Sequence, residues 1–474
     1  MLFTSLVFLF GFLPTILVLY YLLPKASKNY LLLFFSLIFY AWGGVSYTLV
    51  LIISIIANYI FSRLVHQSTI HRKKWLLLGL LVNVGTLVFF KYLDFFIGNI
   101  NALALLANHT FEPLPLAGIV LPLGISFFTF QEMSMLWDIY RNPQTKPGHF
   151  INTALYVSFF PQLIAGPIVR YNDIVDQINN RIESIGLVNS GIKKFILGLF
   201  KKIVFANTCG SLADTILNSE LSELSTSVAW LGILAYALQI YFDFSGYSDM
   251  AIGLGRMFGF RILENFNFPY ISTSIKEFWR RWHISLSSWF RDYLYIPLGG
   301  NRHGPYRTYF NLFVVFLLTG FWHGATWSFV FWGVFHGSFL IIERLGFDKV
   351  LNRLPAVISW MYTILVVLIG WVFFRIENFS DATFFVYKLF GGGPTVEEHF
   401  LKYLDNERLF ILSLAIVASS TFFLRLKNVA LNIRAKVVSI PLLLMVDYLL
   451  IGMMLYAVLY VNSGSYNPFI YFRF

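Results

Sequence analysis

The sequence predicts an all-α, polytopic membrane protein of about 11–13 transmembrane and re-entrant helices, because apolar runs of spanning length recur along it. Hydrophobic residues make up 57% of the 474 residues, and charged residues make up only 12%. A soluble domain carries about 25% charged residues. The basic residues gather in short loops between the apolar runs, as they do on the cytoplasmic side of membrane proteins.

The same composition excludes several classes of protein. The formal net charge is +11, but its location in short loops argues against nucleic-acid binding. The single cysteine, Cys209, leaves no internal disulfide and no cysteine-based metal site, and the sequence has no His-x-x-x-His pair. We therefore expect no metal and no bound cofactor. No repeat or Pro/Ser-rich linker divides the chain, so residues 1–474 are expected to form a single integral-membrane domain.

The apolar runs predict the individual helices. Residues 1–24 lack a basic region before their apolar stretch, so we expect an uncleaved first span with Lys25 and Lys28 inside. The loop 377–407 has six acidic residues against two lysines, which fits the outer face. The further runs lie at 29–44, 46–64, 75–93, 117–138, 151–169, 188–206, 226–244, 308–342, 355–374, 408–424 and 440–461.

The run 308–342 contains no Asp, Glu, Lys or Arg. As one helix it would be roughly 52 Å long, whereas a bilayer core is about 30 Å thick. Gly320 and Gly324 mark the natural break, so the sequence predicts a helical hairpin that enters the membrane and returns. Basic residues on both sides place its two ends in the cytoplasm, namely Arg302, Arg307, Arg344 and Lys349.

His323 lies at the predicted tip of this hairpin, roughly 23 Å into the membrane. An ionisable side chain at that depth indicates a functional site, although a histidine that only packs between helices is the alternative. The helix break favours function, because irregular backbone in a membrane occurs beside protein or a wet cavity. His336 would face another direction on a straight helix, and a packed hydrogen-bond donor near the inner surface is favoured for it.

Three other segments depart from simple spans. Residues 151–170 contain Pro161, Gly166 and Pro167, which predict a broken helix. Residues 188–206 carry four lysines, which predict an amphipathic helix along the inner surface. Asp243 lies beside an apolar helix, where an interhelical hydrogen-bond acceptor and a group in a polar cavity are equally plausible roles.

Residues 272–302 combine arginines with tryptophans. Ser274 followed by Glu277 matches a capping box and predicts a helix start. Arg280, Arg281 and Arg291 interleave with aromatic residues, which is typical of a helix pair at the cytoplasmic interface. These arginines either anchor the protein or attract a phosphate-bearing donor, since guanidinium groups bind phosphate well.

Several motifs resemble the membrane-bound O-acyltransferase family, in particular its bacterial branch that O-acetylates alginate or peptidoglycan. They are FPQLIAGPIVRY at 160–171, YFDFSGYSDMAIG at 241–253, NFNFPY at 265–270, EFWRRWHISLSSWFRDYLYIPLGGNR at 277–302, FWHGATW at 321–327 and PFIYFRF at 468–474. The resemblance implies a helical bundle around a tunnel that joins both faces. It also implies that His323 of the WHG motif is essential and that His283 of the WHISLS motif lies near the reaction centre.

This resemblance implies transfer of an acetyl group from cytoplasmic acetyl-CoA to a hydroxyl that arrives from outside. His323 would act as the base, since imidazole has an unperturbed pKa of about 6.5. His283 would orient the donor, support the oxyanion or only shape the tunnel. Trp322, Asp243, Arg280, Arg281 and Arg291 are the predicted substrate-binding residues.

The expected partners are the bilayer of the bacterial inner membrane, an SGNH-type acetyltransferase outside it, and a polysaccharide acceptor such as alginate, or peptidoglycan. The acceptor hydroxyl belongs either to the polymer or to the partner protein. D-alanyl transfer to teichoic acid is the alternative within the family. A transporter or polymer export channel is a distant alternative, because broken helices and buried polar groups suit it too, and an inactive scaffold is another.

Overall fold

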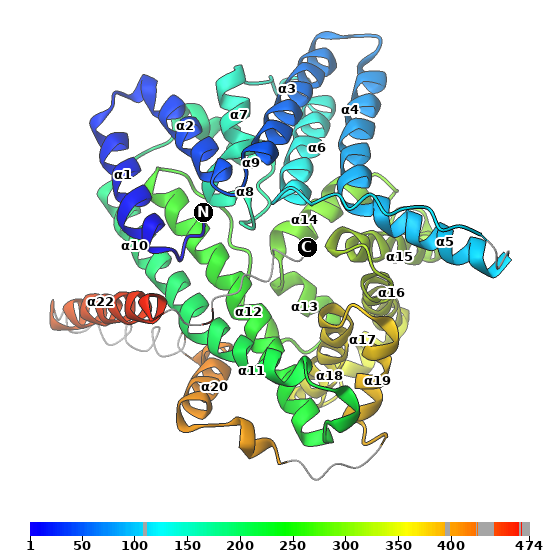
Figure 1. Ribbon diagram of the computed structural model, residues 1–474. Helices are drawn as coiled ribbons and strands as arrows, with labels where there is room; N and C mark the ends of the chain where they lie inside the picture. The colour runs from blue at the N-terminus through cyan, green and yellow to red at the C-terminus, as the bar shows by residue number, and fades with distance from the viewer. Residues whose placement is uncertain (108–110, 394–398, 423, 425–439, 464–465, 467–474) are drawn as a thin grey trace.

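The protein is described here from a computed structural model, in which residues 1–107, 111–393, 399–422, 424, 440–463 and 466 are placed (Figure 1). Every regular element among these residues is a helix, so the all-α prediction is confirmed. The basic residues between 425 and 436 and the motif at 468–474 lie outside the described residues.

In the element labels, η marks segments with 3₁₀ or π hydrogen bonding. The amino-terminal part contains η1 (Val7–Phe12), α1 (Leu13–Leu22), η2 (Lys25–Ser27), α2 (Lys28–Ala41), α3 (Val45–Gln67), α4 (Arg72–Leu87), η3 (Val88–Tyr92), α5 (Leu93–Ala107), α6 (Ile125–Arg141), α7 (Phe150–Ser158), α8 (Phe160–Leu163), α9 (Tyr171–Asn180), α10 (Ile185–Phe200), η4 (Lys201–Ala206) and α11 (Asn207–Leu217).

The remainder of the chain is built in the same way. It contains η5 (Leu221–Glu223), α12 (Thr226–Met257), η6 (Pro269–Ile271), α13 (Ile275–Arg281), α14 (Ile284–Phe290), η7 (Arg291–Tyr295), α15 (Gly304–His323), α16 (Trp327–Ile342), η8 (Glu343–Phe347), α17 (Asp348–Leu351), α18 (Ala356–Arg375), α19 (Phe379–Leu389), η9 (Phe400–Tyr403), α20 (Asn406–Ala418) and α22 (Ile440–Asn462).

Seven helical runs of the described chain are long and apolar enough to cross a membrane. This number is below the predicted 11–13, because several expected spans are short or interrupted. The run 1–24 yields only the shorter apolar helix Val7–Leu22, and the break predicted at Pro161 separates α7 from α8. The seven runs are Val45–Gln67, Arg72–Ala107, Ile185–Leu217, Thr226–Met257, Trp327–Leu351, Ala356–Arg375 and Leu444–Asn462.

The long helix α12 runs through the middle of the bundle, and α10, η4 and α11 lie along it (Figure 1). Glycines allow this close contact. A Cβ atom at Gly198 would lie 2.5 Å from the carbonyl oxygen of Gly246, and one at Gly191 would lie 2.6 Å from that of Gly253. Small residues at such positions are a common way for membrane helices to pack backbone against backbone.

The predicted surface position of residues 188–206 is wrong. These residues belong to the helical run Ile185–Leu217, which is largely buried inside the protein. Three of its four lysines face acidic residues of α12, and the fourth, Lys193, pairs with Asp447 of α22. Lys201 Nζ lies 2.6 Å from Asp249 Oδ2, and Lys202 Nζ lies 2.7 Å from Asp243 Oδ1. Carboxylates on the neighbouring helix therefore allow this lysine face to be buried.

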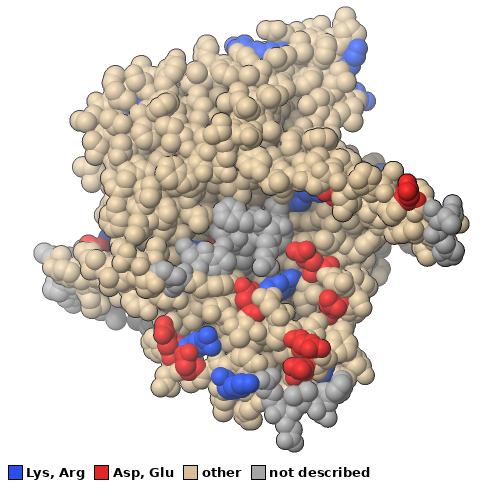
Figure 2. Space-filling model, viewed as in Figure 1, with Lys and Arg blue, Asp and Glu red and all other residues tan. Residues whose placement is uncertain are grey.

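The surface charges are unevenly distributed. In Figure 2, lysines and arginines gather along the top edge, over the connection between α3 and α4, and most of the visible acidic residues lie in the lower half. Arg63, near the end of α3, and Arg72, Lys73 and Lys74, at the start of α4, flank this connection. The distribution agrees with the predicted orientation, which stays a prediction because a bilayer is not part of the structure.

Candidate active site

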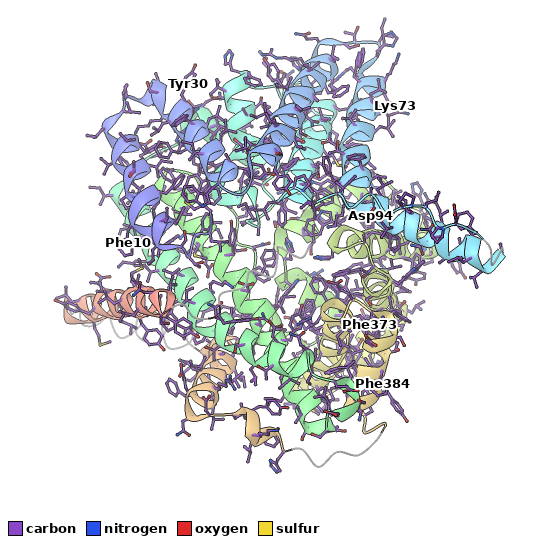
Figure 3. The ribbon with its side chains drawn as sticks, viewed as in Figure 1. Phe10, Tyr30, Lys73, Asp94, Phe373 and Phe384 are labelled. Carbon is purple, nitrogen blue, oxygen red and sulfur yellow. The ribbon has the colours of Figure 1, made fainter. Side chains whose placement is uncertain are left out.

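The predicted hairpin is present as two helices joined by a sharp break. α15 ends at His323, α16 begins at Trp327, and Gly324 between them has an extended backbone. The two arms are in close contact, because a Cβ atom at Gly320 would lie 2.3 Å from the carbonyl oxygen of Phe329. The prediction of a turn at these glycines is confirmed. In the view of Figure 3, this hairpin lies between the labelled residues Asp94 and Phe373.

The imidazole of His323 is buried among aromatic rings. Its centroid lies 5.0 Å from Trp322, 5.1 Å from Trp332 and 4.9 Å from Phe374, and the residue is 3% exposed. Phe374 belongs to α18, so three helices enclose the ring. A neutral imidazole suits such surroundings, because burial in a medium of low polarity disfavours the charged form.

His283 occupies a different kind of turn. It precedes α14 and has a left-handed backbone, with φ 44°. Asn265 holds this turn: its side-chain oxygen accepts hydrogen bonds from the Ser285 N–H at 3.0 Å and the Ser285 hydroxyl at 2.9 Å, and lies 3.3 Å from His283 Nδ1. The Phe244 ring packs on the imidazole at 4.5 Å. A left-handed non-glycine residue is uncommon and often marks a functional position.

Trp322 brings these two histidines into one site. Its ring lies 6.1 Å from the His283 imidazole and 5.0 Å from that of His323. Residues that are 40 positions apart in the sequence therefore flank the same indole. His336 joins the group through Trp332, whose ring is 5.0 Å from His336 and 5.1 Å from His323. The break at Gly324 allows this, because α16 starts in a new direction.

His336 is 1% exposed, and both its ring nitrogens lack a hydrogen-bond partner among the described residues. Its neighbours are Trp279, Trp332 and Phe335, at ring distances of 5.1, 5.0 and 5.5 Å. The sequence favoured a packed donor at this position. The His336 ring is packed as expected. The expected hydrogen bond from one of its ring nitrogens is not found among the described residues.

Two cavities lie near the end of α15. One of about 250 Å³ is at the hairpin break and is lined by Gly324, Lys91 and Glu377 among others. The other, of about 490 Å³, is lined by Trp322, Tyr293 and mostly apolar side chains. A tunnel that joins the two faces stays a prediction.

The predicted substrate-binding arginines lie near the helix α13 and not against the His323 ring. Arg281 Nη2 lies 2.9 Å from Glu277 Oε1, Arg291 Nε lies 2.7 Å from Asp292 Oδ1, and Arg280 is exposed. The capping box is confirmed, because the Ser274 hydroxyl accepts a hydrogen bond from the Glu277 N–H. That these arginines bind the acyl donor stays a prediction.

The carboxyl group of Glu277 reflects its neighbours. Burial alone would raise its pKa, but a hydrogen bond from the Thr273 N–H and the Arg281 guanidinium hold the pKa of the Glu277 carboxyl below its ordinary value.

Asp243, the remaining predicted substrate-binding residue, forms the buried ion pair with Lys202 and directly precedes Phe244, which packs on His283. Its role toward substrate is likewise still a prediction.

Two residues near the histidines were missed by the sequence reasoning. Lys91 donates hydrogen bonds to the carbonyl oxygens of Trp322 at 2.6 Å and His323 at 3.2 Å. Asn265 organises the His283 turn. Lys91 could have been found as the single charged residue of the apolar run 75–93. Asn265 opens the motif NFNFPY at 265–270, but the motif assigned it no role. Among the described residues, no group of three or more His, Cys, Asp or Glu side chains is arranged to hold a metal ion.

Comparison with known proteins decides the family. The model of the membrane-bound O-acyltransferase family matches residues 117–379, which include His283 and His323 and make up more than half of the chain. The chain belongs to the membrane-bound O-acyltransferase family. It is therefore an O-acyltransferase and a multi-pass membrane protein, and its reaction requires an acyl donor.

Three relatives within this family differ in how much of the chain they match. A probable alginate O-acetylase of Pseudomonas putida is 42% identical over all of both chains. A peptidoglycan O-acetyltransferase of Helicobacter pylori is 41% identical over 81% of this chain and 78% of its own. A teichoic acid D-alanyltransferase of Streptococcus thermophilus is 34% identical over 48% of this chain and 58% of its own.

Proposed function

We propose that this membrane-bound O-acyltransferase moves an acetyl group from cytoplasmic acetyl-CoA to a hydroxyl outside, in the O-acetylation of an exported polysaccharide such as alginate, or of peptidoglycan. The observation that carries the proposal is the match to the probable alginate O-acetylase, which is 42% identical over the full length of both chains. The two buried histidines around Trp322 support it, because an acyl transfer to an alcohol needs a base beside the reacting hydroxyl.

In the proposed reaction, the neutral imidazole of His323 accepts the proton of the acceptor hydroxyl. The hydroxyl oxygen attacks the thioester carbonyl carbon, and a tetrahedral intermediate forms. Its carbon–sulfur bond then breaks, and the leaving thiolate takes the proton from the imidazolium. The products are an ester and a free thiol, and the histidine returns to its neutral form. The aromatic surroundings of His323 favour that neutral form and exclude bulk water.

His283 is proposed to orient the donor or to support the oxyanion of the intermediate. Its Nε2 is buried and lacks a hydrogen-bond partner among the described residues, so a substrate atom could take that place. Trp322 would contact both substrates, since its indole lies between the two imidazoles. Arg280, Arg281 and Arg291 would attract the phosphates of the donor at the cytoplasmic entrance.

The proposal also includes a location and a partner protein in the bacterial cell envelope. The protein would lie in the inner membrane, and an SGNH-type acetyltransferase outside would receive or use the acetyl group. D-alanyl transfer is the second candidate, because a teichoic acid D-alanyltransferase is 34% identical to this chain. That match covers 48% of the chain, compared with 81% for the peptidoglycan O-acetyltransferase. Acetyl transfer is therefore the better-supported activity.

The test is to delete the protein from its host and to measure ester-linked acetate on the surface polymers. We expect the acetate to be lost, and to return with the wild-type protein but not with His323→Ala at equal membrane amounts. His303→Ala is the matched control, because His303 is exposed in the loop before α15. Full acetylation with His323→Ala would overturn the catalytic assignment, and loss of ester-linked D-alanine instead of acetate would favour the second candidate.

A further inference from the structure

Lys91 is a buried cation in an apolar part of the fold. It is the single charged residue of the sequence between Lys74 and Asp94. It belongs to η3, a turn of π-helix that interrupts the helical run Arg72–Ala107. Such turns within α-helices are frequently found at functional sites. Placing an ammonium group within a membrane-spanning run has a high free-energy cost, so its presence indicates a specific role.

The use is visible at the end of α15. The last four carbonyl groups of a helix have no partner within it, and the interior of a membrane supplies no water for them. Here the carbonyl of Gly320 accepts from the Gly324 N–H at 3.3 Å, and that of Phe321 accepts from the Tyr92 hydroxyl at 2.6 Å. Lys91 serves the two remaining carbonyls, those of Trp322 and His323.

The ammonium group of Lys91 is thus fully engaged. Beside the two carbonyls, it donates to the Ser126 hydroxyl at 3.3 Å, and the carbonyl of Ser126 lies 3.4 Å from the Trp322 indole nitrogen. The ammonium also lies 5.9 Å from the centre of the Trp322 ring. Among the described residues, no carboxylate lies within ion-pair distance of it. The negative end of the α15 dipole faces this amino group through the carbonyls of Trp322 and His323.

We propose that Lys91 is a positioning residue for acyl transfer, which fixes the direction of the His323 imidazole by holding the final carbonyls of α15. The proposal rests on the proposed function. The backbone of a helix end sets where its side chains point, and a misplacement of about 1 Å in a catalytic group can lower a rate about 100-fold. Lys91 also lines the cavity at the hairpin break together with Gly324, the residue that follows His323.

The test compares variants of Lys91 in the full-length protein. Lys91→Met removes the hydrogen bonds, Lys91→Gln keeps part of them, and Lys91→Arg keeps the charge and the donors. Membrane vesicles from each strain receive labelled acetyl-CoA, and the initial rate of ester formation on the envelope polymer gives kcat and KM for the donor. Lys74→Met is the matched control, since Lys74 is exposed at the far end of the same helical run.

We expect Lys91→Met to lower kcat about 100-fold with KM for acetyl-CoA changed less than about twofold, because the donor site is intact and only the base is misplaced. Lys91→Arg should have at least a tenth of the wild-type kcat. The kcat of Lys91→Gln should lie between those of Lys91→Arg and Lys91→Met. Lys74→Met should equal the wild type. Tyr92→Phe removes only the hydrogen bond to the Phe321 carbonyl and should lower kcat about tenfold. This variant replaces Lys91→Met in the test if Lys91→Met does not reach the membrane.

The role of Lys91 is overturned if Lys91→Met reaches the membrane in wild-type amounts and has the wild-type kcat. If Lys91→Met does not reach the membrane, the same outcome for both Lys91→Gln and Tyr92→Phe overturns it. It is also overturned if Lys91→Arg is as inactive as Lys91→Met although both are folded, since the donors would then not matter. If the wild-type vesicles form no acetyl ester at all, the proposed function fails instead. These outcomes separate the two proposals.

Discussion

The two histidine turns of the site are built in opposite ways. His323 stands at the carbonyl end of α15, and its backbone is held by Lys91 from a segment 232 residues away. His283 stands at the amino end of α14 in a left-handed conformation, and Asn265 from the neighbouring loop holds it. The backbone of the first turn is held by hydrogen bonds from a distant segment, whereas that of the second is held mainly by Asn265, which is 18 residues from His283 in the sequence, although Phe244 of α12 packs on its ring.

This difference indicates two different functions. A turn held by a cation and by several helices is suited to fix a reacting group, because its position follows that of the whole bundle. A locally held turn can adjust its side chain to a bound molecule without disturbing the bundle. We therefore expect the His323 turn to control the chemical step and the His283 turn to control how the donor is seated.

The largest expected effect separates the two histidines directly. His323→Ala should lower kcat by about 10³-fold, since removing a general base usually reduces a rate 10²- to 10⁴-fold. His283→Ala should reduce kcat less and should raise KM for acetyl-CoA. The measurement is the vesicle assay with labelled donor. Equal losses in kcat with unchanged KM in both variants would break the comparison.

The next effect concerns α12, which supports His283 through Phe244. Asp243→Asn leaves Lys202 without its buried partner and should destabilise the protein by about 3 kcal/mol, as thermal unfolding in detergent would show. The double variant Asp243→Leu with Lys202→Met removes both charges and should regain most of that stability. If the double variant is stable and active, Asp243 does not bind substrate; if it is stable and inactive, the substrate-binding prediction gains support.

A smaller effect tests the local turn. Asn265→Ala removes the acceptor for the Ser285 N–H and hydroxyl, so the left-handed backbone at His283 loses its support. We expect about a tenfold lower kcat/KM. The double variant with His283→Ala should be no worse than His283→Ala alone, because both changes disable one unit. An additive loss would mean that Asn265 acts elsewhere.

The smallest effect concerns the helix α13, at the edge of the site. Because the folded-state pKa of Glu277 is below its ordinary value of 4.5, its ionised form stabilises the fold above that pH, and this contribution is lost as the pH falls through the lowered pKa. Glu277→Gln should lower stability at neutral pH by less than about 1 kcal/mol, since the Glu277 side chain is 33% exposed and solvent screens its charge. The thermal stabilities of the two proteins should converge as the pH falls below the lowered pKa of Glu277; a difference that stays constant with pH would exclude the charge as the cause.

The hairpin and the capping box were predictable because their signals are local. An uncharged run too long for one span must break, and glycines on both sides of His323 mark the place. Ser274 and Glu277 carry their helix start within four residues. Both features follow from neighbours in the sequence, and both were found at the expected positions.

The errors concern contacts between distant segments. Residues 188–206 were predicted to lie along the inner surface, because Asp249 and Asp243, the acidic partners of Lys201 and Lys202, come from a helix that the sequence does not place beside them. The contact of His323 and His336 with one tryptophan depends on the angle between α15 and α16, which a count of residues per turn cannot give. Side-chain partners across a bundle are set by packing, and one sequence does not determine that packing.

The glycine contact between α15 and α16 also bears on how such an enzyme works over a full turnover. A methyl group on Gly320 or Gly333 would lie within 2.4 Å of a backbone oxygen of the other arm, so the two helices are packed backbone against backbone and would have to separate before they could slide. We therefore expect the tip that carries His323 to keep its place through a turnover, while the thioester and the alcohol travel to it.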